Sequence, residues 1–350
     1  MAEHPQISQN LVVSPNYGKL SKWDKLKRKV KSIILKKIVD TPLQFKLYPA
    51  YWHYRFQGKG DRRAPVNLNR FLTQKPNYGA GIGHQLANWN SGLYYAGLFG
   101  LKYAHSPFST KKWDEFLGFG QDEILADSLL NDPKFKVVRL PSFNSTRPEE
   151  IELVRNIIRS YTQNNILFLL EQDQGYKAQC GTSDLLKAKF FNARSRADDR
   201  LIFSEDTFNI AVHIRRRMKI ETPEVWSTRG LGNEYFATVL RNTLKNIPSE
   251  KTVAIYLFSQ GEVSEFPEFA EFENINYCVD MGPVESVLHM INADLLISSK
   301  SSFSYKPALI SNGIQIAPKT FWHFYPETDQ YIMADNNGNF EQQKLKSKFI

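Results

Sequence analysis

The clearest pattern of apolar and polar positions lies at residues 208–217. In FNIAVHIRRR the apolar residues recur at every second position, at Phe208, Ile210, Val212 and Ile214. A period of two residues predicts a β-strand that is buried on at least one side. This strand runs directly into Arg215, Arg216 and Arg217. Ligands of open α/β sheets bind at the carboxyl ends of strands, and a guanidinium suits a phosphate, so these arginines are candidate phosphate ligands. The alternative is a solvated basic strand end.

The chain after this strand alternates regularly between short apolar runs and amphipathic segments. The pattern predicts strands at 252–258, 275–279, 294–298 and 314–317, with helices at 233–246, 262–272, 284–292 and 303–311. Strands and helices in alternation imply right-handed crossovers. The C-terminal part is therefore expected to be a parallel, doubly wound α/β sheet.

The N-terminal half is less regular but has the same kinds of element. A helix is predicted at 84–101, a short strand at 135–140, an amphipathic helix at 148–161 and a buried strand at 165–170. No regular element is predicted at 42–65, and 175–205 is polar and at most helical. A chain of 350 residues is long enough for two domains. We expect an extension at 1–65, an N-terminal α/β domain at 66–205 and a C-terminal one at 206–350.

The net charge of +9 is concentrated at the N-terminus. Residues 1–63 contain fourteen Lys and Arg against four acidic residues, which leaves 31 basic and 32 acidic residues for the rest of the chain. Residues 21–38 place Trp23, Leu26 and Val30 on an apolar helical stripe beside many lysines. A basic amphipathic helix of this kind favours an anionic membrane surface. A helix docked on the protein itself and a nucleic-acid arm are the alternatives, and the neutral remainder argues against a nucleic-acid partner.

The expected location is the cytoplasm, on the inner face of a membrane. The start, MAEHPQISQN, lacks a signal peptide, and no run of 18 apolar residues is present. Cys180 and Cys278 lie far apart and have no CxxC spacing.

Glycines precede the predicted helix at 84–101. The peptide GAGIGH contains Gly81, Gly83 and His84 and leads into the start of this helix. The backbone N–H groups at a helix start can bind an anion or a sugar. The spacing is not that of the GxGxxG dinucleotide fingerprint, and a tight turn that needs a positive φ is an equally good explanation.

Hydroxyl groups follow two of the predicted strands. Ser259 follows strand 252–258, and a serine-rich peptide follows strand 294–298, with serines at 298, 299, 301, 302 and 304. Together with Arg215 and Arg216, these residues could receive a nucleoside diphosphate. Simple helix capping is the alternative for each serine. The sequence contains no DxD and no HExxH, so no metal is expected and the arginines would carry the charge of the leaving diphosphate.

Four peptides, in order, resemble the motifs of one enzyme family. They are GAGIGHQLANWNSGLYYA, VHIRRR, YLFSQ and ESVLHMINADLLISSKSSFSYKPALIS. They resemble the GxGNQL, HxRRxD, FSDD and final serine-containing motifs of the α1,2-/α1,6-/protein O-fucosyltransferase superfamily, over roughly residues 68–320. Departures are Met218 for the last Asp of HxRRxD, Gln260-Gly261 for the acids of FSDD, and His84 for Asn.

The resemblance implies a GT-B-like fold, with two Rossmann-like domains facing a cleft, and an inverting, metal-independent reaction. GDP-fucose would be a co-substrate on the C-terminal domain, with no other cofactor, and the acceptor would bind mainly to the N-terminal domain. By the same resemblance Arg215 would bind the β-phosphate, His213 would lie beside the nucleotide, and Ser301 and Ser302 would meet the diphosphate. The acidic residue of the final motif falls on Glu285 or Ser286.

Inverting transfer needs a general base or a largely dissociative reaction without one. Glu221 and Glu224 follow the arginine strand most closely and are the candidate bases. The expected function is transfer of fucose or a related sugar from a GDP-sugar to a glycan or glycolipid. The alternatives are a UDP- or dTDP-sugar donor, and a non-catalytic protein that binds a nucleotide or a glycan.

Overall fold

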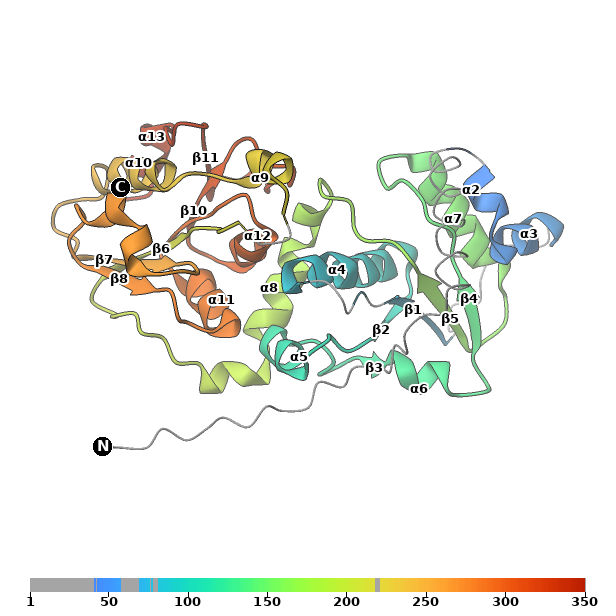
Figure 1. The fold of residues 1–350 in the computed structure, drawn as a ribbon. Helices are drawn as coiled ribbons and strands as arrows, with labels where there is room; N and C mark the ends of the chain where they lie inside the picture. The colour runs from blue at the N-terminus through green and yellow to red at the C-terminus, as the bar shows by residue number, and fades with distance from the viewer. Residues whose placement is uncertain are drawn as a thin grey trace. The chain divides into compact units, whose positions relative to one another are not determined.

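The computed structural model describes residues 41, 43–57, 69–75, 77, 81–217 and 221–349. They form two compact units (Figure 1). The first contains the described residues up to position 80 together with Ser91–Glu115 and Phe119–Asp173. The second contains Gly81–Asn90, Phe116–Gly118 and Gln174–Ile350. Each unit is built around one parallel β-sheet.

The sheet of the first unit has five strands in the order β3-β2-β1-β5-β4. These are β1 (Arg70–Gln74), β2 (Lys102–His105), β3 (Ile124–Leu125), β4 (Lys136–Arg139) and β5 (Ile166–Leu170). The helices of this part of the chain are α2 (Leu43–Lys46), α3 (Pro49–Phe56), α4 (Ile82–Phe99), α5 (Lys111–Leu117), α6 (Ala126–Leu130) and α7 (Pro148–Ser160). Alternate residues of β5 face opposite sides: Phe168 packs with residues of α4 and α7, and Leu167 packs with residues of α6.

The sheet of the second unit has six strands in the order β11-β10-β9-β6-β7-β8. They are β6 (Phe208–His213), β7 (Val253–Phe258), β8 (Ile275–Cys278), β9 (Leu295–Ile297), β10 (Ile314–Pro318) and β11 (Tyr331–Ala334). Every pairing in this sheet is parallel. The order reverses between β6 and β9, and such a switch point is where doubly wound sheets bind ligands at their carboxyl edge.

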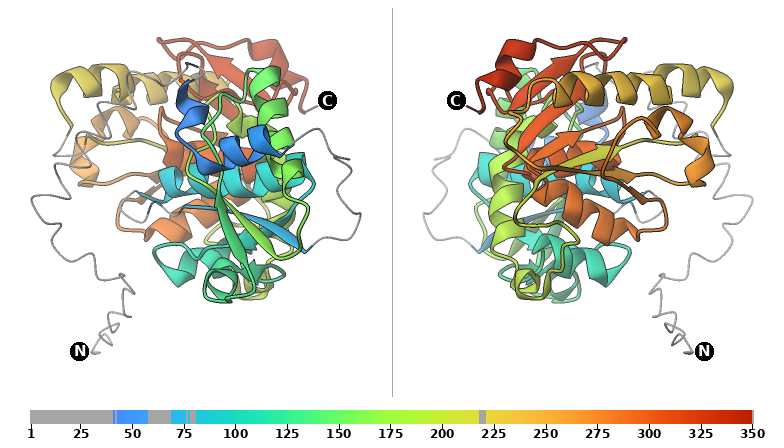
Figure 2. Two further views of the ribbon diagram at one scale, coloured as in Figure 1. Left: turned by 90° about the vertical axis from the view of Figure 1, so that its right-hand side faces the viewer. Right: turned by 90° about the vertical axis from the view of Figure 1, so that its left-hand side faces the viewer.

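Helices cover both faces of this second sheet. They are α8 (Ser183–Phe191), α9 (Pro223–Arg229), α10 (Asn233–Leu244), α11 (Pro283–Asn292), α12 (Ser302–Ile310) and α13 (Gln342–Lys346). The views in Figures 1 and 2 place α10 on one face and α11 on the other. Ile210 and Val212 of the central strand β6, and Ile214 just after it, pack in one core with Phe236 and Leu240 of α10. Side chains of a strand point alternately to its two faces, so His213 points to the opposite face of the sheet. There its ring lies 5.4 Å from that of Phe303 in α12.

The predicted two-sheet α/β architecture is confirmed, and the elements predicted after residue 208 agree closely with the structure. The exception is the predicted helix at 262–272, which is wrong: this segment forms two 3₁₀ turns, Val263–Glu265 and Pro267–Phe269. Pro267 lacks an N–H for an α-helix interior, and the three-residue spacing of buried Phe266 and Phe269 fits a 3₁₀ repeat.

Several elements were not predicted. Residues 42–65, for which no regular element was predicted, contain α2 and α3. The structure also contains elements that the sequence pattern did not predict, among them the strands β1, β2 and β11 and the short helices α5, α6, α9 and α13. The predicted helix at 21–38 lies outside the described residues. None of the described helices is long and apolar enough to cross a membrane.

The segment after residue 174 packs with the second sheet rather than the first. Ser183 Oγ donates a hydrogen bond of 2.6 Å to the carbonyl of Leu309 in α12. Lys306 Nζ, also in α12, donates a 2.7 Å bond to Gln179 Oε1. The contacts thus divide the chain near residue 174, whereas the sequence pattern changes near residue 206.

Candidate functional site

The predicted site residues lie at the carboxyl edge of the six-stranded sheet. Arg215 follows β6, Ser259 follows β7, and Ser298–Ser302 follow β9. The strands β6 and β9 are hydrogen-bonded neighbours at the switch point. Because the carboxyl ends of parallel strands meet at one edge, the structure gathers the arginine peptide and the serine-rich peptide there.

His213 connects these two peptides directly. Its Nδ1 lies 2.8 Å from Ser299 Oγ, and both residues are buried. Burial and the nearby Arg215 guanidinium lower the pKa of His213 to about 3. The imidazole is therefore neutral at pH 7 and forms a hydrogen bond without adding charge beside Arg215.

The serine-rich peptide forms the N-terminal cap of α12. Ser301 Oγ accepts a 3.2 Å hydrogen bond from the Phe303 N–H, as an N-cap residue does. Ser304 Oγ accepts one from the Ser299 N–H at 3.2 Å. Ser301 therefore fits the capping alternative, Ser304 binds the loop before the helix instead, and Ser302 is the first residue of the helix. The first turn of the helix carries N–H groups without intrahelical partners and the positive end of the helix dipole.

The N-terminus of α4 approaches that of α12. A Cβ built on Gly83 would lie 2.7 Å from Ser302 Oγ and 2.8 Å from the Ser302 carbonyl carbon, so only glycine permits this contact. A Cβ on Gly81 would have nothing within 4 Å. Neither glycine has a positive φ, so the tight-turn explanation does not hold for them. Two helix N-termini that meet in this way favour a bound anion.

Lys300 lies in the same peptide and was not predicted from the sequence. Its exposed fraction is 8%, and burial lowers the pKa of its ammonium group. No carboxylate among the described residues forms an ion pair with Lys300. Partial desolvation of an ammonium without a carboxylate partner is unfavourable, so an anion at the two helix N-termini can supply the counter-charge that Lys300 lacks. The signal in the sequence was a single basic residue among the serines of SSKSS.

Glu221 orients Arg215. Its carboxylate, with 5% of the side chain exposed, accepts a hydrogen bond from Arg215 Nη2 and lies 3.5 Å from Arg229 Nη1. The guanidinium of Arg215 also lies 5.5 Å from the ring centroid of Trp226. Its Nη1 is buried and has no hydrogen-bond partner among the described residues. One nitrogen of the guanidinium is thus fixed by Glu221, and the other is left for a further acceptor.

Arg216 has different neighbours from Arg215. It lies 4.2 Å from the Phe266 ring, and it donates a 3.3 Å hydrogen bond to Asn233 Oδ1 and a 3.1 Å bond to the Glu265 carbonyl. Arg215 contacts Glu221 and Trp226, and Arg216 contacts Phe266 and Asn233, so the sequence pair separates into two environments just after β6. Arg216 belongs to the face that α10 covers.

The remaining predicted residues surround this edge. Ser259 Oγ donates a 2.8 Å hydrogen bond to the Ile214 carbonyl. Glu285 is exposed in the first turn of α11, and His84 is exposed in the first turn of α4. Glu224 is exposed in the first turn of α9, and a hydrogen bond with the Thr222 side chain lowers the pKa of its carboxyl group. Met218 lies outside the described residues, and within them no three His, Cys, Asp or Glu side chains cluster to hold a metal ion.

The fold resembles several solved glycosyltransferase structures. Fucosyltransferase NodZ from Bradyrhizobium is 14% identical, with 70% of this chain and 94% of that chain covered and a TM-score of 0.42. POFUT1 in complex with GDP is 12% identical, with 72% and 99% covered and a TM-score of 0.45. A mutant of Arabidopsis thaliana FUT1 in complex with GDP is 12% identical, with 87% and 80% covered and a TM-score of 0.39.

These three structures are fucosyltransferases, the group that the sequence motifs resemble. No known family profile and no curated protein matches the sequence. A shared fold does not by itself establish a shared reaction.

Proposed function

We propose that the chain is an inverting, metal-independent glycosyltransferase that moves fucose or a related sugar from a GDP-sugar to a glycan. The observation that carries this proposal is the contact of Gly83 with Ser302, which joins two helix N-termini beside the buried Lys300. Two positive helix ends and an unpaired ammonium suit a diphosphate better than a neutral ligand. The nature of the sugar and of the base rests on the resemblance of the four sequence motifs.

The proposed donor site uses residues from both peptides. The N–H groups of Gly81 and Gly83 at the start of α4 and those at the start of α12, with the hydroxyls of Ser301 and Ser302, would bind the diphosphate. The His84 N–H already donates a 2.9 Å hydrogen bond to the Gly81 carbonyl, so His84 would meet the donor through its side chain. Arg215, held by Glu221, would neutralise the charge on the departing GDP. The neutral His213 would lie beside the nucleotide, and Ser259 and Glu285, which follow β7 and β8 in the chain, would meet the nucleoside, whereas Arg216 contacts Asn233 and Glu265 on the face that α10 covers.

Glu224 is the proposed general base, and Glu221 is a positioning residue. The carboxylate of Glu221 is already engaged by Arg215 and Arg229, whereas Glu224 is exposed and its lowered pKa keeps it ionised at neutral pH. Glu224 would accept the proton of the acceptor hydroxyl as that oxygen bonds to the anomeric carbon. The bond from the anomeric carbon to the diphosphate breaks on the opposite face, and GDP leaves with the electron pair.

Ligand-induced stabilisation tests the donor. The full chain would be melted with GDP, UDP, dTDP and ADP, first in EDTA and then with Mg²⁺. A nucleotide at a hundred times its Kd adds about 2.7 kcal/mol to the free energy of unfolding. Stabilisation by GDP in EDTA, followed by transfer from GDP-fucose to a glycan panel, supports the proposal. Stabilisation by UDP or dTDP alone would mean that the donor is a UDP- or dTDP-sugar. GDP binding without turnover of any GDP-sugar would favour the non-catalytic alternative.

The base assignment needs its own experiment. Glu224→Gln should lower kcat by about 10²-fold and remove the acidic limb of the pH–rate profile, with GDP affinity unchanged. Glu234→Gln, an exposed carboxylate in the first turn of α10, is the matched control. An unchanged pH profile in Glu224→Gln would exclude Glu224 as the base and would favour the alternative, a dissociative reaction without a protein base.

We further propose that the chain attaches peripherally to an anionic membrane surface, on the cytoplasmic side, through residues 21–38. The structure adds exposed apolar side chains in the next described segment: Leu43, Leu47, Trp52 and Phe56 are 52%, 53%, 41% and 79% exposed. Residues 41–57 contain Lys46 and Arg55 but no acidic residue. Sedimentation with vesicles of phosphatidylglycerol, but not of phosphatidylcholine, is expected, with loss in high salt. Equal sedimentation of a 1–40 deletion variant would contradict the assignment to 21–38.

A further inference from the structure

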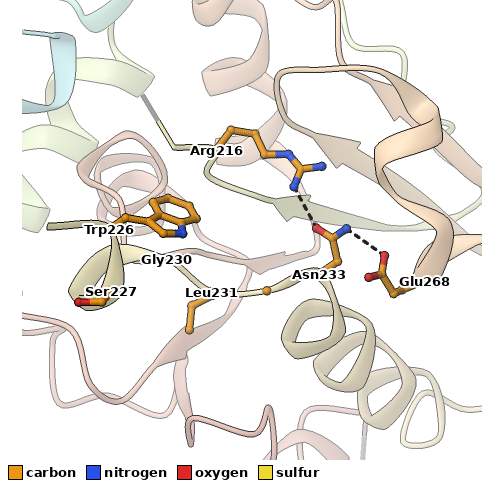
Figure 3. A pocket seen from close by; sticks show the side chains of 8 residues that line it. Arg216, Trp226, Ser227, Gly230, Leu231, Asn233 and Glu268 are labelled. Carbon is orange, nitrogen blue, oxygen red and sulfur yellow. Dashed lines mark hydrogen bonds between the residues drawn. The ribbon is translucent and has the colours of Figure 1, made fainter. Parts of the chain in front are cut away.

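A pocket of about 340 Å³ lies on the α10 side of the second unit, next to the candidate site (Figure 3). Its walls come from the end of β6, from α9, from the loop that leads into α10 and from the segment after β7. The lining residues are Arg216, Trp226, Ser227, Gly230, Leu231, Gly232, Asn233 and Glu268. The size is at the low end of small-molecule sites, which fits one ring rather than a whole nucleotide.

One wall of this pocket is an aromatic ring. Trp226, in α9, packs one part of its indole against the backbone of Gly230, where a Cβ would collide with the ring. The Gly230 N–H donates a 2.6 Å hydrogen bond to the Trp226 carbonyl, which fixes the loop against the helix. The indole N–H forms no hydrogen bond with a described residue. The tryptophan thus presents a rigid flat surface with an unused donor.

The opposite wall is a row of polar groups (Figure 3). Arg216 Nη1 donates to Asn233 Oδ1 at 3.3 Å, and Asn233 Nδ2 donates to Glu268 Oε2 at 2.9 Å. Arg216 Nε is buried without a hydrogen-bond partner among the described residues. Glu265 engages the same row: its carbonyl accepts from Asn233 Nδ2 at 2.7 Å and from Arg216 Nη2 at 3.1 Å, and its carboxylate lies 3.3 Å from Arg216 Nη2. The row therefore alternates guanidinium, amide and carboxylate, and it offers mainly acceptors, the oxygens of Asn233 and Glu268.

We propose that this pocket binds a single pyranose ring. The apolar C–H face of the sugar would stack on Trp226, and neighbouring hydroxyls would donate hydrogen bonds to Asn233 Oδ1 and to the Glu268 carboxylate. A purine also stacks on tryptophan, but its second flat face would then meet the charged row instead of an apolar surface. An aromatic wall that faces a polar wall suits a sugar ring, which has an apolar C–H face and hydroxyl groups around it.

The role of this sugar site in the reaction rests on the proposed transferase function. The Trp226 ring lies 5.5 Å from the guanidinium of Arg215, the residue proposed to bind the leaving diphosphate. A sugar on Trp226 would thus lie beside the reacting centre, as a subsite for the acceptor glycan on the nucleotide-binding unit. Binding of the sugar itself does not require turnover.

The direct test is ¹⁹F NMR of the full chain labelled with 5-fluorotryptophan. The six tryptophans give separate resonances, and Trp226→Phe assigns the one of interest. L-Fucose, D-galactose, D-glucose, N-acetyl-D-glucosamine and guanosine would each be titrated. The expected result is a saturable shift of the Trp226 resonance with at least one monosaccharide and none with guanosine, while the signals of buried Trp89 and Trp113 stay unchanged. A Trp226 resonance that no monosaccharide moves, or that only guanosine moves, overturns the proposal.

A second variant gives a readout that does not depend on Trp226→Phe. Glu268→Gln keeps the size of the side chain and should weaken monosaccharide binding by about tenfold, because the sugar hydroxyl then donates to a neutral amide instead of a charged carboxylate. Glu271→Gln, in the same segment but paired with Arg241, should leave it unchanged. GDP stabilisation is measured on the same samples: sugar binding without GDP binding overturns the transferase proposal alone, and GDP binding without sugar binding overturns the subsite alone.

Discussion

A Cβ on Gly83 would lie 2.7 Å from Ser302 Oγ, so the starts of α4 and α12 approach as closely as a backbone and a side chain allow. The contact brings two positive helix ends to one edge of the six-stranded sheet. The proposed binding of the diphosphate depends on this approach.

Gly83→Ala is expected to separate the two helix starts. The added methyl group meets the Ser302 backbone as well as its hydroxyl, so overpacking should lower the free energy of unfolding by about 1–3 kcal/mol. GDP affinity should fall about tenfold or more, as measured by calorimetric titration. Gly81→Ala is the matched control, because a Cβ there has nothing within 4 Å. Equal GDP affinity in the two variants would separate nucleotide binding from this contact.

Glu221→Gln is expected to disturb Arg215 without touching the donor. Removal of one partner from a largely buried ion pair should destabilise the chain by about 3 kcal/mol and lower kcat by about 10²-fold. The measurements are urea unfolding and transfer from GDP-fucose.

The double variant Arg215→Met/Glu221→Gln distinguishes the two effects. It should recover most of the stability, since no buried guanidinium is left unpaired, but transfer should stay lost. Arg229 also loses Glu221 in this variant, but its side chain is 42% exposed and stays hydrated. Transfer that returns with stability would show that Arg215 has only a structural role. Arg241→Ala, at an exposed ion pair of α10, should change neither quantity much.

Lys300→Met is expected to have opposite effects on stability and on binding. The variant removes a partly desolvated ammonium that has no carboxylate partner among the described residues, so the unliganded chain should gain stability, by less than about 1 kcal/mol. GDP affinity should fall by about tenfold or more, because a charge-assisted contact with phosphate is lost. Thermal melts with and without GDP give both values. Lys319→Met, at an exposed lysine, is the control, and a loss of stability in Lys300→Met would contradict the unpaired state of this ammonium.

The stability of the chain should fall as the pH decreases below about 6.5. Burial, together with Arg215 for His213 and Lys306 for His323, lowers the pKa of both histidines from 6.5 to about 3. Between these values the unfolded chain binds protons that the folded chain does not, so the free energy of unfolding decreases with decreasing pH. Each histidine contributes at most about 1.4 kcal/mol per pH unit. Urea unfolding at pH 7 and pH 5 measures the change.

Two variants test the source of this pH dependence. His213→Asn keeps a polar atom near Ser299, and His323→Phe keeps the ring that stacks 4.1 Å from Tyr305. Each should lose less stability than the unaltered chain between pH 7 and pH 5. Identical pH dependence in all three proteins would mean that these histidines are not the groups that titrate.

Most of the second sheet could be predicted from the sequence. The alternation in β6, the apolar run of β7 and the amphipathic pattern of α10 and α11 are local, and burial of one face suffices to explain them. The elements that were missed are short or lack a period: α3 places Tyr, Trp and His residues in a single two-turn helix, and β11 has four residues. Such segments take their conformation from the elements that they pack against.

The sequence by itself determined which residue types stand at the carboxyl ends of β6, β7 and β9, because strand ends follow from local pattern. Only the tertiary structure decided how they are used. The contact of Gly83 with Ser302, the burial of Lys300 and the hydrogen bond of His213 with Ser299 join residues that are far apart in the chain. The separation of Arg215 from Arg216 likewise depends on which helices cover the two faces of the sheet. A local pattern determines the face of the sheet toward which a side chain points. Which residue it contacts there depends on how distant helices and loops pack on that face, and the local pattern contains no information about that packing.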